Sequence, residues 1–160
     1  MSMILKPPAP LVFDRTLPSV FLAGSIEMGK ADDWQLELED GLRDTPAVVL
    51  NPRRDDWDAS WKQSMSDPNL RAQVEWELDA QEAATCIAMY FEPKTKAPIT
   101  LLELGLFART GKVIVCCPEG YWRKGNVDIV CARYGVPQVS NLAELLSSIR
   151  DRLFSRQAPR

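Results

Sequence analysis

Residues 19–31 read SVFLAGSIEMGKA, a short apolar run followed by a turn that contains two glycines. An apolar run of about five residues that ends in a glycine is typical of a buried strand leading into a turn. Gly24, Gly29 and Lys30 also have the spacing G-x-x-x-x-G-K of a phosphate-binding loop. The stretch therefore predicts a strand that leads into a helix, through a turn that is a candidate for ligand binding.

The residues around this turn argue against a triphosphate site. A working phosphate loop needs a serine or threonine after the lysine to hold magnesium, and that position is Ala31. Glu27 would also place a negative charge where phosphates must lie. Two interpretations remain open: a glycine turn that only lets the strand enter a helix, or a turn that holds a small ligand. In the second, Gly24 would allow close backbone approach and Ser25 would offer a hydroxyl.

The same alternation of short apolar runs and longer amphipathic segments continues along the chain. Strands are expected at residues 19–23, 47–51, 86–91, 112–117 and 137–140, and helices at about 31–44, 68–85, 100–110, 126–134 and 141–155. Strands that alternate with helices form parallel sheets through right-handed crossovers. Five such units predict an α/β fold, a flavodoxin-like doubly wound five-stranded parallel sheet with strand order 2-1-3-4-5. Ligands then bind beyond the carboxyl ends of the strands, where the strand order reverses.

Local chemistry supports the helix boundaries. Asp67 followed by Pro68 predicts an N-cap with proline in the first turn, and Gly111 and Gly135 stand where C-caps belong. Asn126 is expected to cap the fourth helix. Residues at close to helical period predict the buried stripes: Trp34, Leu38 and Leu42 on the first helix, and Leu70, Val74, Leu78 and Ala84 on the second.

Length and composition limit the class of protein. A chain of 160 residues with 46% hydrophobic residues supports one domain, with the proline-rich first ten residues and the tail at 155–160 expected to be disordered. A net charge of -3 and an isoelectric point near 5.1 predict no nucleic-acid partner. No apolar run approaches the roughly 18 residues that span a bilayer, and prolines interrupt the N-terminus where a signal peptide needs an apolar centre. We therefore expect a soluble, cytoplasmic protein.

Cysteine and histidine usage narrows the chemistry. The four cysteines, Cys86, Cys116, Cys117 and Cys131, lie in apolar surroundings without C-x-x-C spacing and are expected to be buried free thiols. The chain has no histidine, which excludes a Ser-His-Asp triad, a Cys-His pair and a histidine-ligated metal. Catalysis must then use carboxylates, hydroxyls, lysines or backbone groups.

Two stretches place carboxylates near the expected crevice. Thr100 followed three residues later by Glu103 predicts a capping box, which would put Glu103 in the first turn of its helix, where the helix dipole favours an ionised carboxylate. Such a carboxylate could instead attack a sugar C1′. The preceding helix carries Glu75, Glu77, Asp79 and Glu82, either as a solvated face or with one carboxylate turned into the crevice to handle a proton.

Two polar loops could cover the same edge of the sheet. NPRRDDWDASW at 51–61 contains two tryptophans suited to packing on a flat ring, and PEGYWRKGN at 118–126 contains a tyrosine and a third tryptophan. Either loop could equally be an ordinary surface loop whose aromatic side chains pack into the core.

The order of five motifs resembles the nucleoside 2-deoxyribosyltransferase-like family. The motifs are VFLAGSI at 20–26, NPRR at 51–54, QVEWEL at 73–78, ITLLELGL at 99–106 and CPEGYWRKGNVDIV at 117–130, and the resemblance runs from about residue 19 to 138. It implies a flavodoxin-like fold and a glutamate nucleophile in the E-L-G motif, here Glu103. It also implies an acid on the preceding helix, here Glu77, and a sugar and base pocket at the first-strand turn.

The resemblance implies a reaction and its partners. The enzyme would cleave the N-glycosidic bond of a 2′-deoxynucleoside through a covalent glutamyl-deoxyribose intermediate and transfer the sugar to a free nucleobase, with no metal or organic cofactor. Assembly as a homo-oligomer, a dimer or larger, is also implied. We expect substrate contacts from Ala23, Gly24, Ser25, Asn51, Arg53, Trp57, Glu92 and Asn126. A hydrolase that gives the same intermediate to water and a non-catalytic nucleoside-binding module are the alternatives.

This chain departs from the family pattern at two positions. Transferases of the family carry another acid a few residues before the nucleophile, where this chain has Ala97 and Pro98, so that Glu92 is the only acid nearby. The monophosphate N-hydrolases carry an arginine for the 5′-phosphate in the first turn, where this chain has Glu27. The second departure favours free nucleosides over nucleotides.

Overall fold

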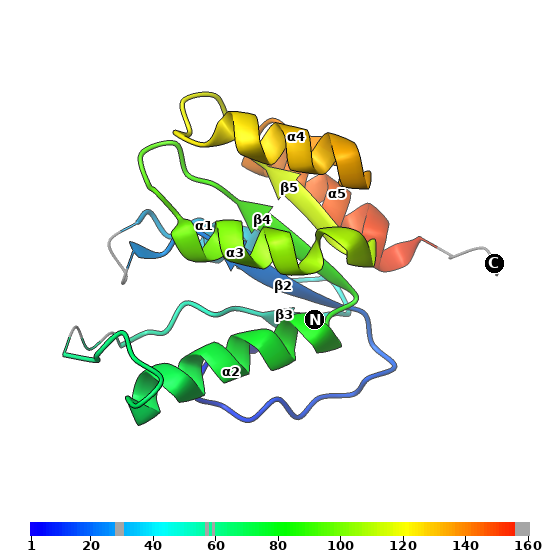
Figure 1. Ribbon diagram of the computed structural model, residues 1–160. Coiled ribbons are helices and arrows are strands. Elements are labelled where there is room, and N and C mark those ends of the chain that lie inside the picture. Colours follow the sequence, from blue (N-terminus) through cyan, green and yellow to red (C-terminus); the bar gives the residue numbers. More distant parts are fainter. Residues whose placement is uncertain (28–30, 57, 59, 156–160) are drawn as a thin grey trace.

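The computed structural model in Figure 1 describes residues 1–27, 31–56, 58 and 60–155. Its strands are β1 (Met3–Leu5), β2 (Ser19–Gly24), β3 (Val48–Leu50), β4 (Cys86–Tyr90), β5 (Val113–Cys116) and β6 (Gln138–Val139). Its helices are α1 (Trp34–Gly41), α2 (Pro68–Ala83), α3 (Pro98–Phe107), α4 (Lys124–Tyr134) and α5 (Leu142–Phe154), with a short 3-10 helix η2 (Ala108–Thr110) after α3. Each predicted strand and helix is present, with boundaries that differ by a few residues.

The strands form one parallel sheet in the order β1-β3-β2-β4-β5-β6. The five predicted strands, β2 to β6, have the predicted relative order, and the α/β doubly wound class is confirmed. The predicted strand count is wrong, because β1 pairs with β3 and adds a sixth strand at the edge. The expected disorder of the first ten residues is therefore corrected. A three-residue strand is too short to give a periodic signal, and the prolines that suggested disorder begin two residues after it.

The segment between β1 and β2 passes over α2 (Figure 1). The indole Nε1 of Trp76 donates to the carbonyl oxygen of Ala9 at 2.8 Å, and Leu11 and Phe13 pack against the core. The N-terminal segment thus covers one side of α2. The predicted disordered tail from residue 156 lies outside the described residues.

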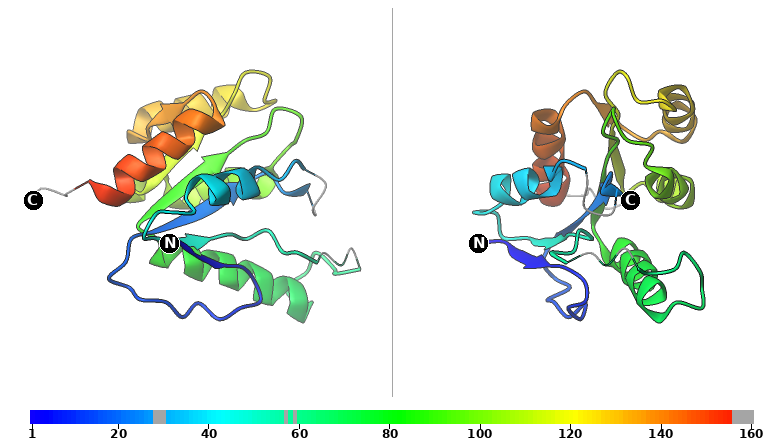
Figure 2. Two further views of the ribbon diagram at one scale, coloured as in Figure 1. Left: turned by 180° about the vertical axis from the view of Figure 1, so that it is seen from behind. Right: turned by 90° about the vertical axis from the view of Figure 1, so that its left-hand side faces the viewer.

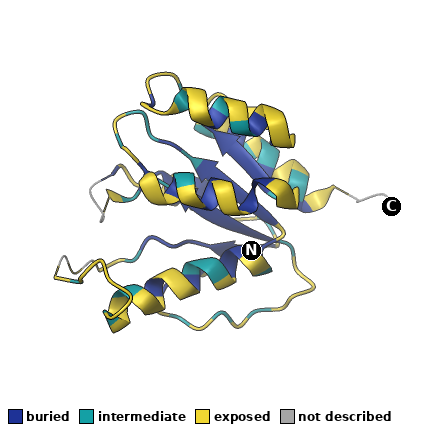
Figure 3. Cartoon of the chain, viewed as in Figure 1, coloured by how far each residue is buried: buried dark blue, intermediate teal, exposed yellow. Residues whose placement is uncertain are grey.

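The helices cover both faces of the sheet, α1 and α5 on one and α2, α3 and α4 on the other (Figure 2). Alternation along β2 shows this directly, since Val20 and Leu22 join the α1/α5 core while Phe21 and Ala23 join the other. A strand that is buried on both faces reads as a continuous apolar run, which is why β2 could be recognised in the sequence. Figure 3 shows the sheet as the buried layer between exposed helix surfaces.

Several predicted helix ends are confirmed. The Asp67 carboxylate accepts from the backbone N–H groups of Asn69 and Leu70 at the start of α2. Gly135 ends α4 and Gly111 ends η2, both with positive φ. The prediction for Asn126 is wrong, because α4 begins at Lys124 and Asn126 lies inside its first turn.

The buried face of α2 differs from the prediction. Ala84 is buried and Leu78 packs against the core as predicted, but Val74 is 41% exposed. The buried residues of the helix are Gln73, Trp76, Ala80 and Gln81. The prediction for α1 is confirmed, since Trp34, Leu38 and Leu42 are all buried. A search for apolar residues alone missed the face of α2 because two of its buried positions are glutamines.

Candidate active site

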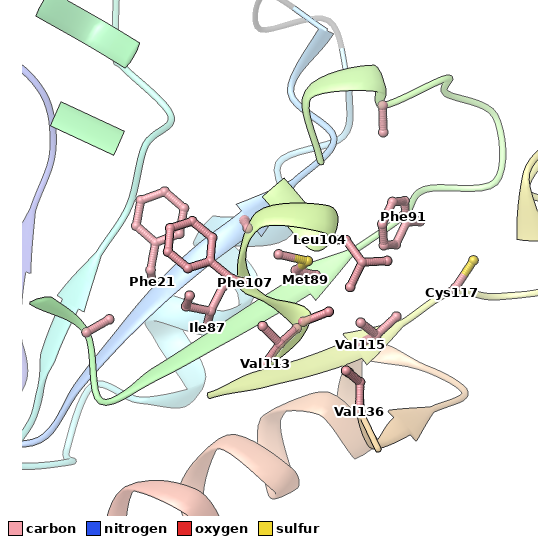
Figure 4. Close-up of a cluster of buried hydrophobic side chains, with 14 of the residues drawn as sticks. Phe21, Ile87, Met89, Phe91, Leu104, Phe107, Val113, Val115, Cys117 and Val136 are labelled. Atoms are coloured by element: carbon pink, nitrogen blue, oxygen red, sulfur yellow. The ribbon is translucent and has the colours of Figure 1, made fainter. Parts of the chain in front are cut away.

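Packing of α3 on the sheet fixes the direction of Glu103. Leu104 and Phe107 point from α3 into a cluster that includes Ile87 and Met89 of β4 (Figure 4). Glu103 lies one residue before Leu104 and four before Phe107. Its side chain therefore projects from the side of α3 next to this buried face. Glu103 is only 7% exposed. A carboxylate this deeply buried needs a partner, because burial without one is costly.

The capping box predicted for Thr100 and Glu103 is wrong. The helix begins at Pro98, and Ala97 stands at the N-cap with a left-handed backbone and no side-chain cap. Thr100 is already inside the helix, and Glu103 lies in the second turn. Proline at the first helical position moved the start of the helix two residues ahead of the threonine. The helix dipole therefore contributes less at Glu103 than the sequence suggested, because its effect fades beyond the first turn.

The hydrogen-bond partner of Glu103 lies on a polar stripe of α2. Gln73, Glu77 and Gln81 are spaced four residues apart and lie above one another along the helix. Gln81 donates its Nε2 to Glu103 Oε2 and to the backbone oxygen of Glu77. Gln73 donates its Nε2 to Glu77 Oε1 at 3.3 Å. The structure thus brings together the two carboxylates that the sequence assigned to catalysis.

Both carboxyl groups hold their protons more tightly than exposed glutamates. Burial raises the pKa of Glu103 to about 7, against the opposing hydrogen bond from Gln81. Burial, followed by the charge of Glu103, raises the pKa of Glu77 to about 8, with Gln73 opposing the rise. Because the first negative charge opposes a second one nearby, the pair can hold one ionised and one neutral carboxyl near neutral pH.

The loop after β3 also reaches this pair. Arg54 Nη1 donates to Gln73 Oε1 at 3.2 Å, and its guanidinium lies 4.9 Å from the centre of the Trp61 ring. An arginine can only donate, so the Gln73 oxygen must face Arg54 and its nitrogen must face Glu77. Arg54 thus orients the amide that binds Glu77. Trp57, expected to contact substrate from the same loop, lies outside the described residues.

The first-strand turn is tied to the β4–α3 loop. A Cβ at Gly24 would lie 2.3 Å from the backbone oxygen of Tyr90 and 2.5 Å from the Trp34 ring, so this position requires glycine. The Ser25 hydroxyl accepts from the Glu92 N–H at 3.1 Å and lies 2.6 Å from Thr95 Oγ1. Gly24 allows the close approach of the two loops and Ser25 joins them by hydrogen bonds, and a role for the turn in ligand binding stays a prediction.

Glu27 turns its carboxylate toward the start of α3. Its Oε1 accepts from the Ala97 N–H at 3.2 Å, and its backbone has a φ of 50°. A negative charge at a helix N-terminus is favourable. Glu27 therefore occupies the position at which this helix end would attract an external anion.

Asn51 and Arg53 connect β3 to the α1 side of the fold. Asn51 Nδ2 donates to Glu39 Oε1 at 2.6 Å, and Asn51 Oδ1 accepts from the Arg53 N–H. The Arg53 guanidinium donates to the carbonyl oxygens of Ala31 and Asp32. These bonds fix the loop that follows the first-strand turn.

Glu92 and Ala23 lie at the carboxyl edge of β4 and β2. Burial, followed by the nearby charge of Asp32, raises the pKa of Glu92, and one of its carboxylate oxygens is buried without a hydrogen-bond partner among the described residues. Ala23 is 1% exposed and faces the side of the sheet that α2 and α3 cover. Both positions are compatible with the crevice expected from the strand order.

Asn126 lies apart from the carboxylate pair, in a groove between α3 and α4. The groove has a volume of about 330 Å³ and is lined by Leu101, Leu104, Gly105, Trp122, Arg123, Asn126, Val127 and Val130. Its lining is mostly apolar, and Asn126 is exposed there.

Sequence reasoning missed Gln73, Gln81 and Arg54. The first two could have been found from their spacing, since glutamines four residues before and after Glu77 must share its helix face. Arg54 could not be distinguished from Arg53 in the sequence, because neighbouring loop residues point in directions that only the fold decides.

The raised pKa values predict that stability falls as pH rises. The unfolded chain ionises these carboxyls near the ordinary value of 4.5, whereas the folded protein keeps both protons until about pH 7 and 8. The folded state therefore binds more protons between about pH 4.5 and 8, and the free energy of unfolding declines across that window. For Glu103 alone the loss is on the order of 3 kcal/mol, since one pKa unit is about 1.4 kcal/mol.

Thermal unfolding at several pH values tests this prediction. The chain has no histidine, so the carboxyl pair should dominate the titration between pH 5 and 8. We expect a lower Tm at pH 8 than at pH 5.5, and a flatter profile in Glu103→Gln. A wild-type Tm that rises over the same range would contradict the assignment of raised pKa values.

The four cysteines are buried free thiols, as predicted. Within the described residues, no helix is both long and apolar enough to cross a bilayer.

Comparison with known proteins supports the resemblance seen in the motifs. A family model described as nucleoside 2-deoxyribosyltransferase like matches residues 17–121, well over half of the chain. The match includes the first-strand turn, Glu77 and Glu103, but ends before Asn126. No curated protein matches the chain significantly. The chain belongs to the nucleoside 2-deoxyribosyltransferase-like family.

Proposed function

We propose that this protein transfers 2-deoxyribose between nucleobases, with Glu103 as nucleophile and Glu77 as the group that exchanges the proton. The observation that carries the proposal is the buried carboxyl pair, in which burial raises both pKa values and the charge of Glu103 raises that of Glu77 further. Pairs of acids whose environments separate their pKa values are typical of sites that need one base or nucleophile and one acid. The family membership supplies the substrate class.

In the first step, an oxygen of ionised Glu103 attacks C1′ of the deoxynucleoside. The bond between C1′ and the base nitrogen breaks, and its electron pair goes to that nitrogen. Neutral Glu77 delivers its proton to the departing base. The products are a neutral free base, an ester between Glu103 and deoxyribose, and ionised Glu77.

In the second step, a nitrogen of the acceptor base attacks C1′ and the ester bond breaks. Glu103 leaves as a carboxylate, and Glu77 takes the proton from the attacking nitrogen. Two displacements at C1′ preserve its configuration, as in retaining glycosidases. The absence of an electron-withdrawing 2-hydroxyl eases the oxocarbenium-like transition state, so deoxynucleosides should react better than ribonucleosides.

The position of Glu27 supports free nucleosides over nucleotides. Its carboxylate accepts from the Ala97 N–H at the start of the helix that carries Glu103. A 5′-phosphate near this helix end would meet a negative charge instead of a free N–H group.

Product analysis tests the reaction. The protein is incubated with deoxyinosine or thymidine and free adenine, and the nucleosides are separated by chromatography. A new deoxyadenosine peak supports transfer. Release of free base without the new nucleoside indicates the hydrolase alternative, and no change with any nucleoside would contradict the enzymatic proposal in favour of a binding module.

We also propose that the protein assembles as a homo-oligomer through the outer face of α3. Ile99, Leu102 and Leu106 are 57%, 61% and 55% exposed, and their spacing of three and four residues places them on one side of this helix. Trp122 and Ile129, near and on α4, are 51% and 71% exposed. Exposed apolar side chains that gather on one face of a helix are typical of subunit contacts.

A charge on this face should prevent assembly. Leu102→Glu is expected to give a monomer, because pairing would bury an unpaired carboxylate. Size-exclusion chromatography with light scattering measures the mass. Met65→Glu, at an apolar residue that is 82% exposed elsewhere, is the matched control and should keep the wild-type mass. A wild-type monomer would contradict the assembly proposal.

A further inference from the structure

Gln81 is a fully buried amide that links the Glu103 carboxyl group to the backbone of Glu77. Its side chain is 0% exposed, although it carries two polar atoms. The Nε2 atom donates to Glu103 Oε2 and, at 3.1 Å, to the backbone oxygen of Glu77. One hydrogen of the amide nitrogen is thus donated to an acceptor on α2, and the other is donated to an acceptor on α3.

The chemistry of its partners supports this orientation of the amide. A backbone carbonyl and an ionised carboxylate can only accept, so the nitrogen of Gln81 must face both of them. The Oε1 atom is then buried with no hydrogen-bond partner among the described residues. A buried acceptor without a donor destabilises a fold. The hydrogen bond to Glu103 therefore leaves the Oε1 atom of Gln81 without a donor.

We propose that Gln81 is a positioning residue, which holds Glu103 Oε2 so that the other oxygen, Oε1, can attack C1′. This inference rests on the proposed function. It assigns a role to Gln81, which lies outside the motif QVEWEL at 73–78 that contains Glu77. Among the described residues, Glu103 Oε1 has no hydrogen-bond partner. Fixing one oxygen of a carboxylate restricts rotation of the group and keeps the other in one direction.

The same hydrogen bond favours the ionised carboxylate. Gln81 opposes the effect of burial on the pKa of Glu103. Three other charged groups lie near the site. Glu77 on α2 repels a second negative charge, Arg54 reaches Glu77 through Gln73, and Lys112 Nζ donates to the backbone oxygen of Gln81 at 3.0 Å. Strand β2, which contacts both helices, has no titratable side chain. Gln81 is therefore the donor that lowers the pKa of Glu103.

Gln81→Met separates positioning from a structural role. Methionine has a similar volume and length, fills the buried space and removes both the donor and the unpartnered oxygen. If Gln81 served the fold, the Tm would fall. Because its oxygen is unpartnered, we expect an equal or higher Tm at pH 5.5, where Glu103 is protonated and leaves no unpaired charge. We also expect a fall in kcat of about tenfold to a hundredfold, the usual effect of losing a hydrogen bond to a charged group.

The test combines kinetics with a direct titration. Carbon-13 NMR of labelled glutamate follows the Glu103 carboxyl, assigned with Glu103→Gln. In Gln81→Met its pKa should rise by about one unit or more, and the acid limb of the kcat profile should move to higher pH by the same amount with little change in KM. Ser19→Ala is the control. Ser19 stands at the amino end of β2, where its hydroxyl accepts from the Thr85 N–H, and its replacement should leave both measurements unchanged.

The outcomes are distinguishable from failure of the proposed function. An unchanged Glu103 pKa in folded Gln81→Met would overturn the inference even if Glu103→Gln is inactive. A fall in Tm without an effect on the pKa would assign Gln81 to the structure alone. If Glu103→Gln retains activity, the proposed function fails, whereas the titration still measures the Gln81 hydrogen bond.

Discussion

Glu103→Gln should lose deoxyribosyl transfer by at least about a thousandfold while the protein remains folded. The substitution keeps the size of the side chain and leaves an oxygen to accept from Gln81, so the contact between α2 and α3 can persist. An amide is a poor nucleophile toward C1′ and cannot form the ester. Glutamine is also neutral, so the variant avoids ionising a buried group above pH 7 and should be at least as stable as the wild type.

The measurement is chromatographic turnover, together with intact-mass analysis of acid-quenched reactions. The wild type should gain the mass of one deoxyribosyl group, and Glu103→Gln should not. Glu82→Gln, on the exposed side of α2, is the matched control and should react and label normally. Normal turnover by a folded Glu103→Gln protein would exclude this glutamate as the nucleophile.

The fold could be predicted because its signals are local. Strands such as β2 and β4 are buried on both faces and therefore read as short apolar runs between turn residues. The strand order of the five βα units followed from general rules of connection. Strand β1 escaped because three residues carry no period, and its partner β3 is distant in the sequence.

The site could be predicted only in part, because it depends on contacts between helices. Motif resemblance indicated Glu103 and Glu77, but not that Gln81 joins their helices. The capping box failed because Thr100 and Glu103 fit a local pattern that Pro98 overrides by starting the helix earlier. The structure adds that the Ser25 hydroxyl contacts Glu92 and Thr95, which the sequence did not indicate, and its contact with substrate stays a prediction.

Polar residues on the buried face of α2 were the most informative deviation from an apolar stripe. Gln73 and Gln81 occupy positions where leucine or alanine would give a more stable helix contact. Natural sequences depart from such local rules mainly at functional sites. The departure therefore agrees with the proposal that the reaction takes place between α2 and α3.

Glu77→Gln should separate proton transfer from nucleophilic attack. The base leaves C1′ readily only if its nitrogen is protonated, and Glu77 is the neutral acid of the pair at neutral pH. We expect kcat/KM for deoxyinosine to fall by about a hundredfold to ten-thousandfold, the usual range for loss of a general acid. A substrate with a nitrophenolate leaving group needs no proton, so its rate should fall much less.

The pH profile gives an independent signature of the same role. Wild-type activity should rise as Glu103 ionises near pH 7 and decline as Glu77 ionises near pH 8, which gives a narrow bell. In Glu77→Gln the alkaline limb should disappear. The acid limb should stay near pH 7, because Glu77 is still neutral when Glu103 loses its proton.

Glu75→Gln tests whether these effects belong to Glu77. Glu75 lies two residues earlier on α2, is exposed and pairs with Arg71, so its loss should change neither the leaving-group dependence nor the profile. An equal fall for deoxyinosine and the nitrophenyl substrate would show that Glu77 supports the site without donating a proton. Departure of nitrophenolate needs the nucleophile but no proton donor. A nitrophenyl rate that persists in Glu77→Gln and is lost in Glu103→Gln would therefore assign proton donation to Glu77 and nucleophilic attack to Glu103.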